Sequence, residues 1–190
     1  MISVVDYDPA WADRFEVLRD AYSVALAASD VPFTAIEHVG STAVVGLAAK
    51  PIIDVDVVVP YDSVLAASDV LVRLGFVPRG ERGIPLRWAF WEPPRLRDTN
   101  AYVVVDGSLA LRNHLAVRDL LRADEALRNE YAEVKHRVAA TAADIFDYGR
   151  GKNAVLQKIL QAAGLSTKER ASIGANQVPT VYEVPRPIDT

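Results

Sequence analysis

The sequence of 190 residues contains no cysteine. This absence excludes disulfide bonds and metal sites built on thiolates. No apolar run approaches the roughly 20 residues that a membrane-spanning helix needs, although 51% of the residues are hydrophobic. The first residues, Met1 to Asp6, lack the basic and then apolar segments that are typical of a signal peptide. We therefore expect a soluble cytoplasmic protein that does not associate with a membrane.

Positive charge is also not in excess. The 21 lysine and arginine residues are outnumbered by 25 aspartate and glutamate residues, which gives a net charge of −4 at pH 7. This balance argues against a surface that binds nucleic acid over its whole extent, although a local basic patch is compatible with it. A small molecule or a nucleotide is the more expected ligand.

The hydrophobic pattern predicts a small mixed sheet with flanking helices, followed by a helical portion, which is the α+β class. Strands are expected at residues 33–39, 51–59, from 76, at 86–91 and at 101–105, and helices from 9, at 43–49, 61–74, 108–121, from 124 and at 144–164. We divide the chain into a core of residues 1–107, a helical portion of residues 108–164 packed on it, and an irregular tail. The tail, residues 165–190, shows no periodicity and could serve as an arm on a second subunit of a homo-oligomer.

Two carboxylates stand in an apolar run. Asp54 and Asp56 lie within Pro51–Val59, a segment typical of a buried strand. The side-chain period of two places both on one face of that strand. Because an isolated buried carboxylate is very costly, the pair requires a counter-charge, and oxygen ligands of this kind suit a divalent cation. The pattern therefore predicts a Mg²⁺ or Mn²⁺ site.

The residues just before this strand add a second feature. Gly40 and Ser41 predict a tight turn whose backbone N–H groups could bind a phosphate. Lys50 is a candidate partner for a phosphate or a carboxylate. His38 is a candidate substrate contact, or alternatively forms a structural pair with Glu37.

Two other interpretations of the aspartates stay open. In one, an aspartate lies at the surface end of the strand and the other pairs with a basic residue. In the second, Asp-x-Asp after a strand belongs to a phosphatase with an aspartate nucleophile, although no downstream pair of aspartates completes that magnesium site.

Basic residues elsewhere supply further candidates. Arg87 lies among other arginines and aromatic residues and could clamp a phosphate, because arginine is the planar partner of that group; the alternative is a solvated strand edge. Lys135 and Lys152 each follow a tyrosine by four residues, so each pair shares a helix face. Such pairs are more often ordinary contacts, but the lysines would bind an anion if the helical portion folds over the aspartates.

The residue pattern resembles known families. Gly-Ser followed by Asp-x-Asp on a strand resembles the signature of the polymerase-β-like nucleotidyltransferases, and residues 36–55 as a whole resemble the GrpB family. The latter likeness extends over roughly residues 4–160. It implies a nucleotidyltransferase-like α+β core with a C-terminal helical portion. It also implies that Gly40 and Ser41 approach a triphosphate and that Asp54 and Asp56 hold magnesium.

The chain departs from the family's pattern on the neighbouring strand. A third carboxylate is expected there, and the family's His-x-His is replaced by Asn100 and Tyr102. Asp106, Glu92 or Asp98 are the acidic residues that could complete the site. The resemblance thus predicts a metal-dependent nucleotidyltransferase-like enzyme that binds a nucleoside triphosphate and modifies or activates a small acceptor. The alternatives are a non-catalytic nucleotide- or metabolite-binding accessory domain, or a pocket that performs condensation or ligation on an acidic substrate.

Overall fold

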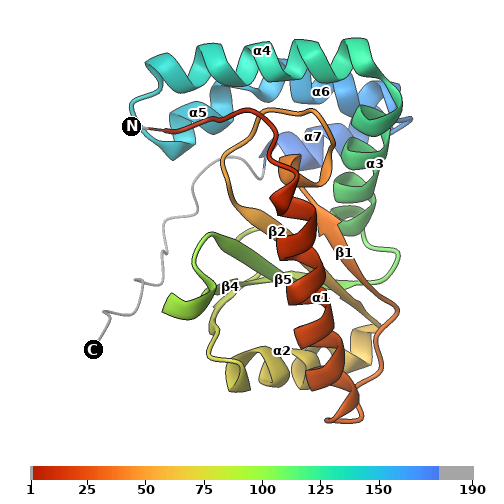
Figure 1. The fold of residues 1–190 in the computed structure, drawn as a ribbon. Helices are drawn as coiled ribbons and strands as arrows, with labels where there is room; N and C mark the ends of the chain where they lie inside the picture. The colour runs from red at the N-terminus through yellow and green to blue at the C-terminus, as the bar shows by residue number, and fades with distance from the viewer. Residues whose placement is uncertain (1, 176–190) are drawn as a thin grey trace.

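The structure, a computed structural model, describes residues 2–175 and is built on a five-stranded mixed sheet in the order β1-β2-β5-β4-β3 (Figure 1). The neighbouring strands β2 and β5 are parallel, and the other neighbouring strands are antiparallel. The strands are β1 (Ala35–Val39), β2 (Ile53–Val59), β3 (Val77–Gly80), β4 (Arg87–Trp91) and β5 (Thr99–Val105). The predicted α+β class is confirmed.

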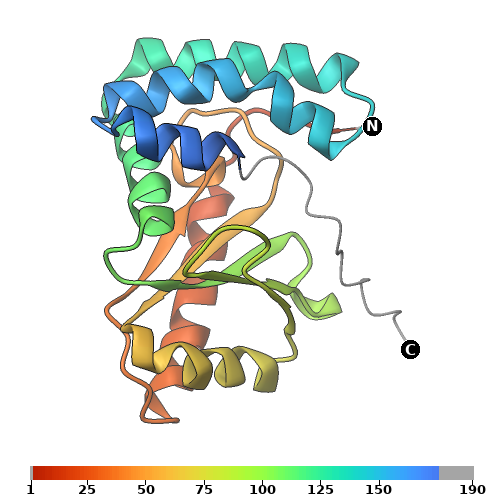
Figure 2. The same cartoon turned by 180° about the vertical axis from the view of Figure 1, so that it is seen from behind.

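Helices cover the two faces and one end of this sheet. Figure 1 shows α1 and α2 on one face, and both views show the later helices gathered at one end of the sheet (Figures 1 and 2). The helices are α1 (Ala10–Ala27), α2 (Val64–Arg73), α3 (Leu109–Ala123), α4 (Glu125–Thr141), α5 (Ile145–Gly151), α6 (Asn153–Ala162) and α7 (Thr167–Ala175). Within residues 2–175, no helix combines the length and the apolar character needed to cross a membrane.

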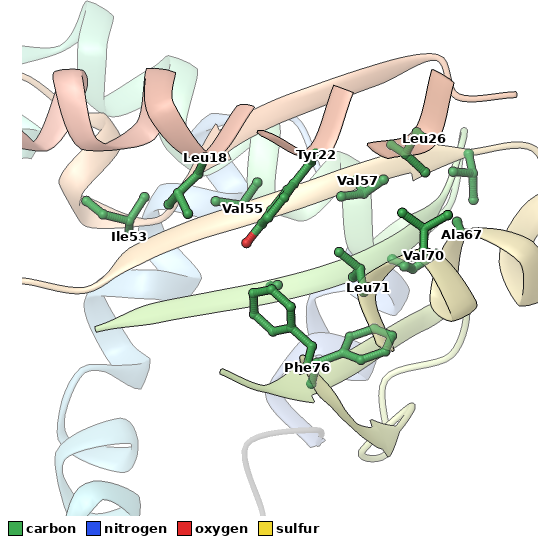
Figure 3. Close-up of a cluster of buried hydrophobic side chains, with 14 of the residues drawn as sticks. Leu18, Tyr22, Leu26, Ile53, Val55, Val57, Ala67, Val70, Leu71 and Phe76 are labelled. Atoms are coloured by element: carbon green, nitrogen blue, oxygen red, sulfur yellow. The ribbon is translucent and has the colours of Figure 1, made fainter. Parts of the chain in front are cut away.

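The main core lies between the sheet and the helices α1 and α2. Alternate residues of β2, including Val55 and Val57, point into it and meet Leu18, Tyr22 and Leu71 (Figure 3). Because side chains alternate along a strand, Asp54 and Asp56 face the opposite side, on which α3 lies against β1 and β5. The strand pattern that packs the core therefore also orients the two aspartates.

Three helices begin where the sequence analysis expects them, each after a residue whose side chain caps the helix. The Ser108 hydroxyl accepts the N–H of Leu111 at 3.2 Å at the start of α3. The carboxylates of Asp124 and Asp144 cap α4 and α5 in the same way, at 2.9 and 2.7 Å. Side-chain caps satisfy N–H groups that have no partner inside the helix.

The prediction of a helix at residues 43–49 is wrong. A 3-10 turn spans Ser41–Ala43, after which Val44 is extended and Gly46 has a φ of +79°. Ala49 then exchanges two backbone hydrogen bonds with Val5. These hydrogen bonds stabilise an extended segment between the turn and β2, and the local sequence does not predict this conformation.

Two further differences lie near the C-terminus. The helix expected at residues 144–164 is divided into α5 and α6 at Lys152. The tail, expected to be irregular from residue 165, begins instead with α7, whose start is a capping box: Ser166 and Glu169 bond each other's backbone N–H groups. Residues 176–190 lie outside the described residues, so the expectation that this segment serves as an arm stays a prediction.

Candidate functional site

Asp54 lies at the start of β2, beside Asn100 at the start of β5. The two residues are register partners, and the Asn100 amide donates a hydrogen bond to Asp54 Oδ1 at 2.8 Å. Burial raises the pKa of the Asp54 carboxyl, and the hydrogen bond from Asn100 opposes this shift. The position at which the family pattern predicts part of a metal site thus carries an amide donor that stabilises the carboxylate.

Asp56 is fully buried and pairs with a residue that is far away in the sequence. Its Oδ2 lies 2.7 Å from Nδ1 of His114, on α3. Its Oδ1 is buried and has no hydrogen-bond partner among the described residues. The sequence interpretation missed this pairing, because only the packing of α3 on the sheet brings the two residues together.

Gly40 approaches the Asp54 carboxylate more closely than any other residue type could. Its φ is +71°, and a Cβ atom there would lie 2.2 Å from Asp54 Oδ2 and 2.9 Å from its Cγ. A side chain would therefore be strained by its backbone and would also collide with the carboxylate. This contact explains the glycine of the predicted turn.

A buried hydrogen-bond chain fixes the turn. The Thr42 hydroxyl donates to the Ile52 carbonyl at 3.0 Å, so the His38 Nε2–H donates to Thr42 Oγ1 at 3.1 Å. The His38 ring stacks on Phe15 with 4.6 Å between ring centroids. Burial lowers the pKa of His38 to about 4, so the ring is neutral at pH 7. The geometry thus gives His38 a structural role and does not place it in the pocket lining.

Two arginines of α3 hold the same turn from the other side. Arg118 donates to Glu37 Oε2 at 2.6 Å and to the His38 carbonyl at 3.1 Å. Arg122 donates to the Ala43 carbonyl through Nε at 3.0 Å and through a terminal nitrogen at 2.8 Å. The helical portion therefore fixes the turn in place, which the sequence interpretation also missed.

These elements surround a polar pocket of about 220 Å³, here called the lysine pocket. Its lining comes from the turn after β1, the segment that leads into β2, the starts of β2 and β5, the helices α4 and α5, and the junction between α5 and α6. It includes Gly40, Ser41, Asp54, Asn100, Tyr148 and three lysines, Lys50, Lys135 and Lys152. Most of the predicted site residues thus meet in one place, with three ammonium groups facing a single lining carboxylate.

The lysines are held in an environment that disfavours their charge. Lys135 is 2% exposed, and its Nζ has no hydrogen-bond partner within the described part of the chain. Burial lowers the pKa of Lys135 to about 7, and the charge of Lys152 adds to the shift. Burial likewise lowers the pKa of Lys152 to about 8, with a contribution from Lys50. An anion in the pocket would relieve this repulsion.

Two expectations for the site are not met in the lysine pocket: the presence of Arg87 and a third carboxylate for a metal ion. Arg87, on β4, stacks its guanidinium on the Tyr102 ring at 4.5 Å and is not among the residues that line the pocket. No group of three histidine, aspartate or glutamate side chains within residues 2–175 is arranged to hold a metal ion. The expected third carboxylate therefore does not join Asp54 and Asp56.

Comparisons of the sequence and the structure with known proteins find several relatives. The family model described as GrpB protein matches residues 1–162. A UPF0157 protein of Deinococcus radiodurans is 34% identical over 166 residues, which cover 87% of this chain and 84% of that protein. The crystal structure of the conserved protein GrpB from Enterococcus faecalis matches with a TM-score of 0.74 at 32% identity, covering 85% of this chain and 96% of that one.

A more distant match concerns the fold alone. The structure of the GLD-2/RNP-8 complex matches with a TM-score of 0.52 at 17% identity, covering 98% of this chain and 74% of that one. The structure of a cytoplasmic RNA terminal U-transferase likewise matches with a TM-score of 0.52 at 16% identity, covering 70% of this chain and 42% of that one. These matches confirm the predicted nucleotidyltransferase-like architecture at the level of the fold.

Proposed function

The chain belongs to the GrpB family, and we propose that its lysine pocket binds a nucleoside triphosphate and supports transfer of the nucleotidyl group to a small acceptor. The observation that carries this proposal is the convergence of Lys50, Lys135 and Lys152 beside Asp54. The fold shared with nucleotidyltransferases gives the expectation of a nucleotide, and the charges give the expectation of its phosphates.

The lysines provide the phosphate contacts of the proposal. Three ammonium groups against one carboxylate in the lining leave an excess of positive charge. A buried ammonium without a hydrogen-bond partner, such as that of Lys135, is costly unless an anion accompanies it. Phosphate oxygens would satisfy Lys135 and stabilise its charged form. In a transfer reaction, the same lysines would stabilise the charge that develops on departing pyrophosphate.

The carboxylates fit one divalent cation shared with the ligand. Asp56 Oδ1 is a buried acceptor without a partner among the described residues, and Asp54 opens into the pocket. Mg²⁺ is commonly held by one or two carboxylates together with substrate phosphates. Asp54 and Asp56 would therefore hold it, and the ion would supply charge neutralisation at the α-phosphate. Asn100 orients Asp54 through its hydrogen bond, and His114 orients Asp56.

A second candidate function is supported by the Asn100 amide. A donor at this position stabilises the Asp54 carboxylate without a metal ion, and no third carboxylate joins the pair within residues 2–175. A domain that binds a nucleotide or metabolite without transferring any group would have this arrangement. The two candidates share the ligand and differ in whether pyrophosphate is released.

The experiment is a melting-temperature panel with nucleoside triphosphates, with and without Mg²⁺ or Mn²⁺. Saturation at about 100 times Kd adds roughly 2.7 kcal/mol of stability, which is a shift on the order of 5–10 °C for a chain of this size. We expect a metal-dependent shift with at least one nucleotide, and its loss in an Asp54→Asn/Asp56→Asn variant that is still folded by circular dichroism. Equal shifts in the variant, or no shift with any nucleotide, would overturn the proposal. Pyrophosphate release in the presence of acceptors then separates the two candidates.

A further inference from the structure

A second pocket lies between the β3–β4 loop, α3 and α7, and has a volume of about 140 Å³. Its walls are mainly apolar: Ile84 and Leu86 from the loop, Leu109 from α3 and Ile173 from α7. This size is below the roughly 300–1,000 Å³ typical of pockets for drug-sized ligands. The space suits the aliphatic or aromatic chain of a small molecule.

Residues of β2 and α3 that contact each other contribute, together with their neighbours, to the lysine pocket and to the second pocket. Asn113 lines the second pocket, and the next residue of α3, His114, is bonded to Asp56. Asp54, two residues before Asp56 on the same strand face, lines the lysine pocket. The hydrogen bond between Asp56 and His114 therefore joins a strand that contributes to the lysine pocket with a helix that contributes to the second pocket.

An arginine borders the apolar space. Arg87 is the register partner of Val104, so the two side chains share one face of the sheet. Val104 packs with Ala110 and Ile84, which both line the second pocket. Arg87 stacks on Tyr102, and its Nε is buried without a hydrogen-bond partner among the described residues. None of the ion pairs found within residues 2–175 includes Arg87. Arg87 itself does not line the pocket, but it directly follows the lining residue Leu86 in the sequence, and it lacks a counter-ion within residues 2–175.

A residue that lines the pocket also has a polar atom without a partner among the described residues. Asn113 Oδ1 is buried and accepts no hydrogen bond from residues 2–175. Buried acceptors of this kind are rare in native proteins and ask for an N–H or O–H donor. The pocket therefore combines apolar walls, a buried acceptor and a neighbouring guanidinium.

The loop that forms one wall is strained. Leu86 has a φ of +64° and Arg82 a φ of +56°, a backbone conformation that is unfavourable for residues other than glycine. The Glu81 carboxylate accepts the Leu86 N–H at 2.6 Å and holds this conformation. Strain that the surroundings enforce is concentrated at ligand sites.

We propose that the second pocket binds a small carboxylic acid with an apolar chain, whose carboxylate pairs with Arg87 and whose N–H or O–H group donates to Asn113. Apolar α-amino acids and 2-hydroxy acids have all three features. Binding of the acid does not depend on the proposed function. Its role as the acceptor does rest on that function: a carboxylate oxygen forms a bond to the α-phosphorus, and the bond from that phosphorus to the departing pyrophosphate oxygen breaks.

The test is isothermal titration of the full chain with apolar amino acids, their 2-hydroxy counterparts, leucinamide and glutamate. We expect at least one apolar acid to bind. Leucinamide, which has no carboxylate, and glutamate, which has a charged chain, should bind at least tenfold more weakly. Absence of binding by every apolar acid, or equal binding of leucine and leucinamide, would overturn the inference. This comparison uses the unmodified chain, so it does not depend on a variant that folds.

Variants then locate the site. Arg87→Met should weaken binding at least tenfold, and Arg19→Met, which removes an exposed arginine of α1, should leave it unchanged. Binding that is equal in both variants contradicts the assignment. Nucleotide titrations of the same samples separate the two proposals. If the protein binds the acid but no nucleotide, only the transfer function is refuted. If the protein binds a nucleotide but no acid, only the proposal for the second pocket is refuted.

Discussion

A Cβ atom on Gly40 would lie 2.2 Å from Oδ2 of Asp54. The turn after β1 therefore touches the carboxylate that lines the lysine pocket, and it does so with a φ of +71°. The glycine is required both for its backbone conformation and for this close approach. Because Asp54 Cβ would also lie 3.1 Å from the added atom, the carboxylate cannot simply rotate away.

Gly40→Ala is expected to destabilise the protein and to weaken nucleotide binding. Gly107→Ala is the matched control, because Gly107 has a φ of +70° but no described atom within 4 Å of the position that a Cβ would take. The control should lose roughly 1–2 kcal/mol from backbone strain alone. Gly40→Ala should lose a further 1–3 kcal/mol or so from overpacking. Urea unfolding measures both, and equal losses in the two variants would contradict the contact.

The affinity for a phosphate-bearing ligand should fall as pH rises. The pKa of Lys135 is lowered to about 7, so the free amine is increasingly neutral above that pH, whereas a bound anion favours the ammonium form. Binding above about pH 7 is therefore accompanied by proton uptake, and affinity decreases between about pH 7 and about pH 9. Calorimetry in buffers of different ionisation enthalpy measures this uptake.

Lys135→Met tests the source of that pH dependence. The variant should bind the anion more weakly at pH 7 and show a shallower pH profile, with Lys152 responsible for the remainder. It should not be less stable, because a buried ammonium without a hydrogen-bond partner among the described residues is removed. In the wild type, the unfolded lysine binds more protons than the folded one between about pH 7 and its ordinary pKa, so its contribution to the free energy of unfolding rises with pH there. An unchanged pH profile in the variant would refute the role of Lys135.

Asn100→Asp should convert the amide position into a third carboxylate. Without a metal ion, the variant loses the hydrogen bond to Asp54 and gains a neighbouring negative charge, so its melting temperature should fall. Mg²⁺ or Mn²⁺ should restore it more than in the wild type, because oxygen ligands are added. Asn100→Leu is the control, since it loses the same hydrogen bond without adding a ligand. If metal ions stabilise both variants equally, Asn100 does not border the cation site.

Gly151 has a packing role that positions Lys152 and Tyr148. A Cβ atom on Gly151 would lie 2.5 Å from Cγ1 of Val138 on α4. Gly151→Ala should therefore destabilise the protein by roughly 1–3 kcal/mol and weaken anion binding. Gly149→Ala, in the same helix with open space around the site, should instead stabilise by roughly 0.5–1 kcal/mol. Adding Val138→Ala to the Gly151 variant should restore stability, and the absence of rescue would contradict the contact.

Much of the fold followed from local chemistry. The alternation along β2 predicted that Asp54 and Asp56 share a face, and the structure confirms it through their pairing with Asn100 and Tyr102. The helix starts at residues 108, 124 and 144 were predicted, and they are local features because Ser108, Asp124 and Asp144 cap these helices through N–H groups only three residues away. The capping box at Ser166 is equally local, so α7 was predictable from the same signal.

The site is assembled by contacts between residues that are far apart in the sequence, and such contacts cannot be predicted from a single sequence. Lys135 and Lys152 were identified as candidates, but their approach to Asp54 requires α4 and α5 to fold over the end of the sheet. The pairing of His114 with Asp56 spans 58 positions. Gly151, the last residue of α5, likewise lies close to Val138 of α4, a contact between segments that are separate in the sequence.

The most direct test of the account is equilibrium binding of nucleoside triphosphates and their matching nucleosides to the wild type and to a Lys135→Met/Lys152→Met variant. The account predicts that a triphosphate binds at least tenfold more tightly than its nucleoside, and that the double variant loses this difference while it stays folded. Equal binding of nucleoside and triphosphate to the wild type, or an undiminished preference in the variant, would contradict the claim that the lysine pocket recognises phosphates.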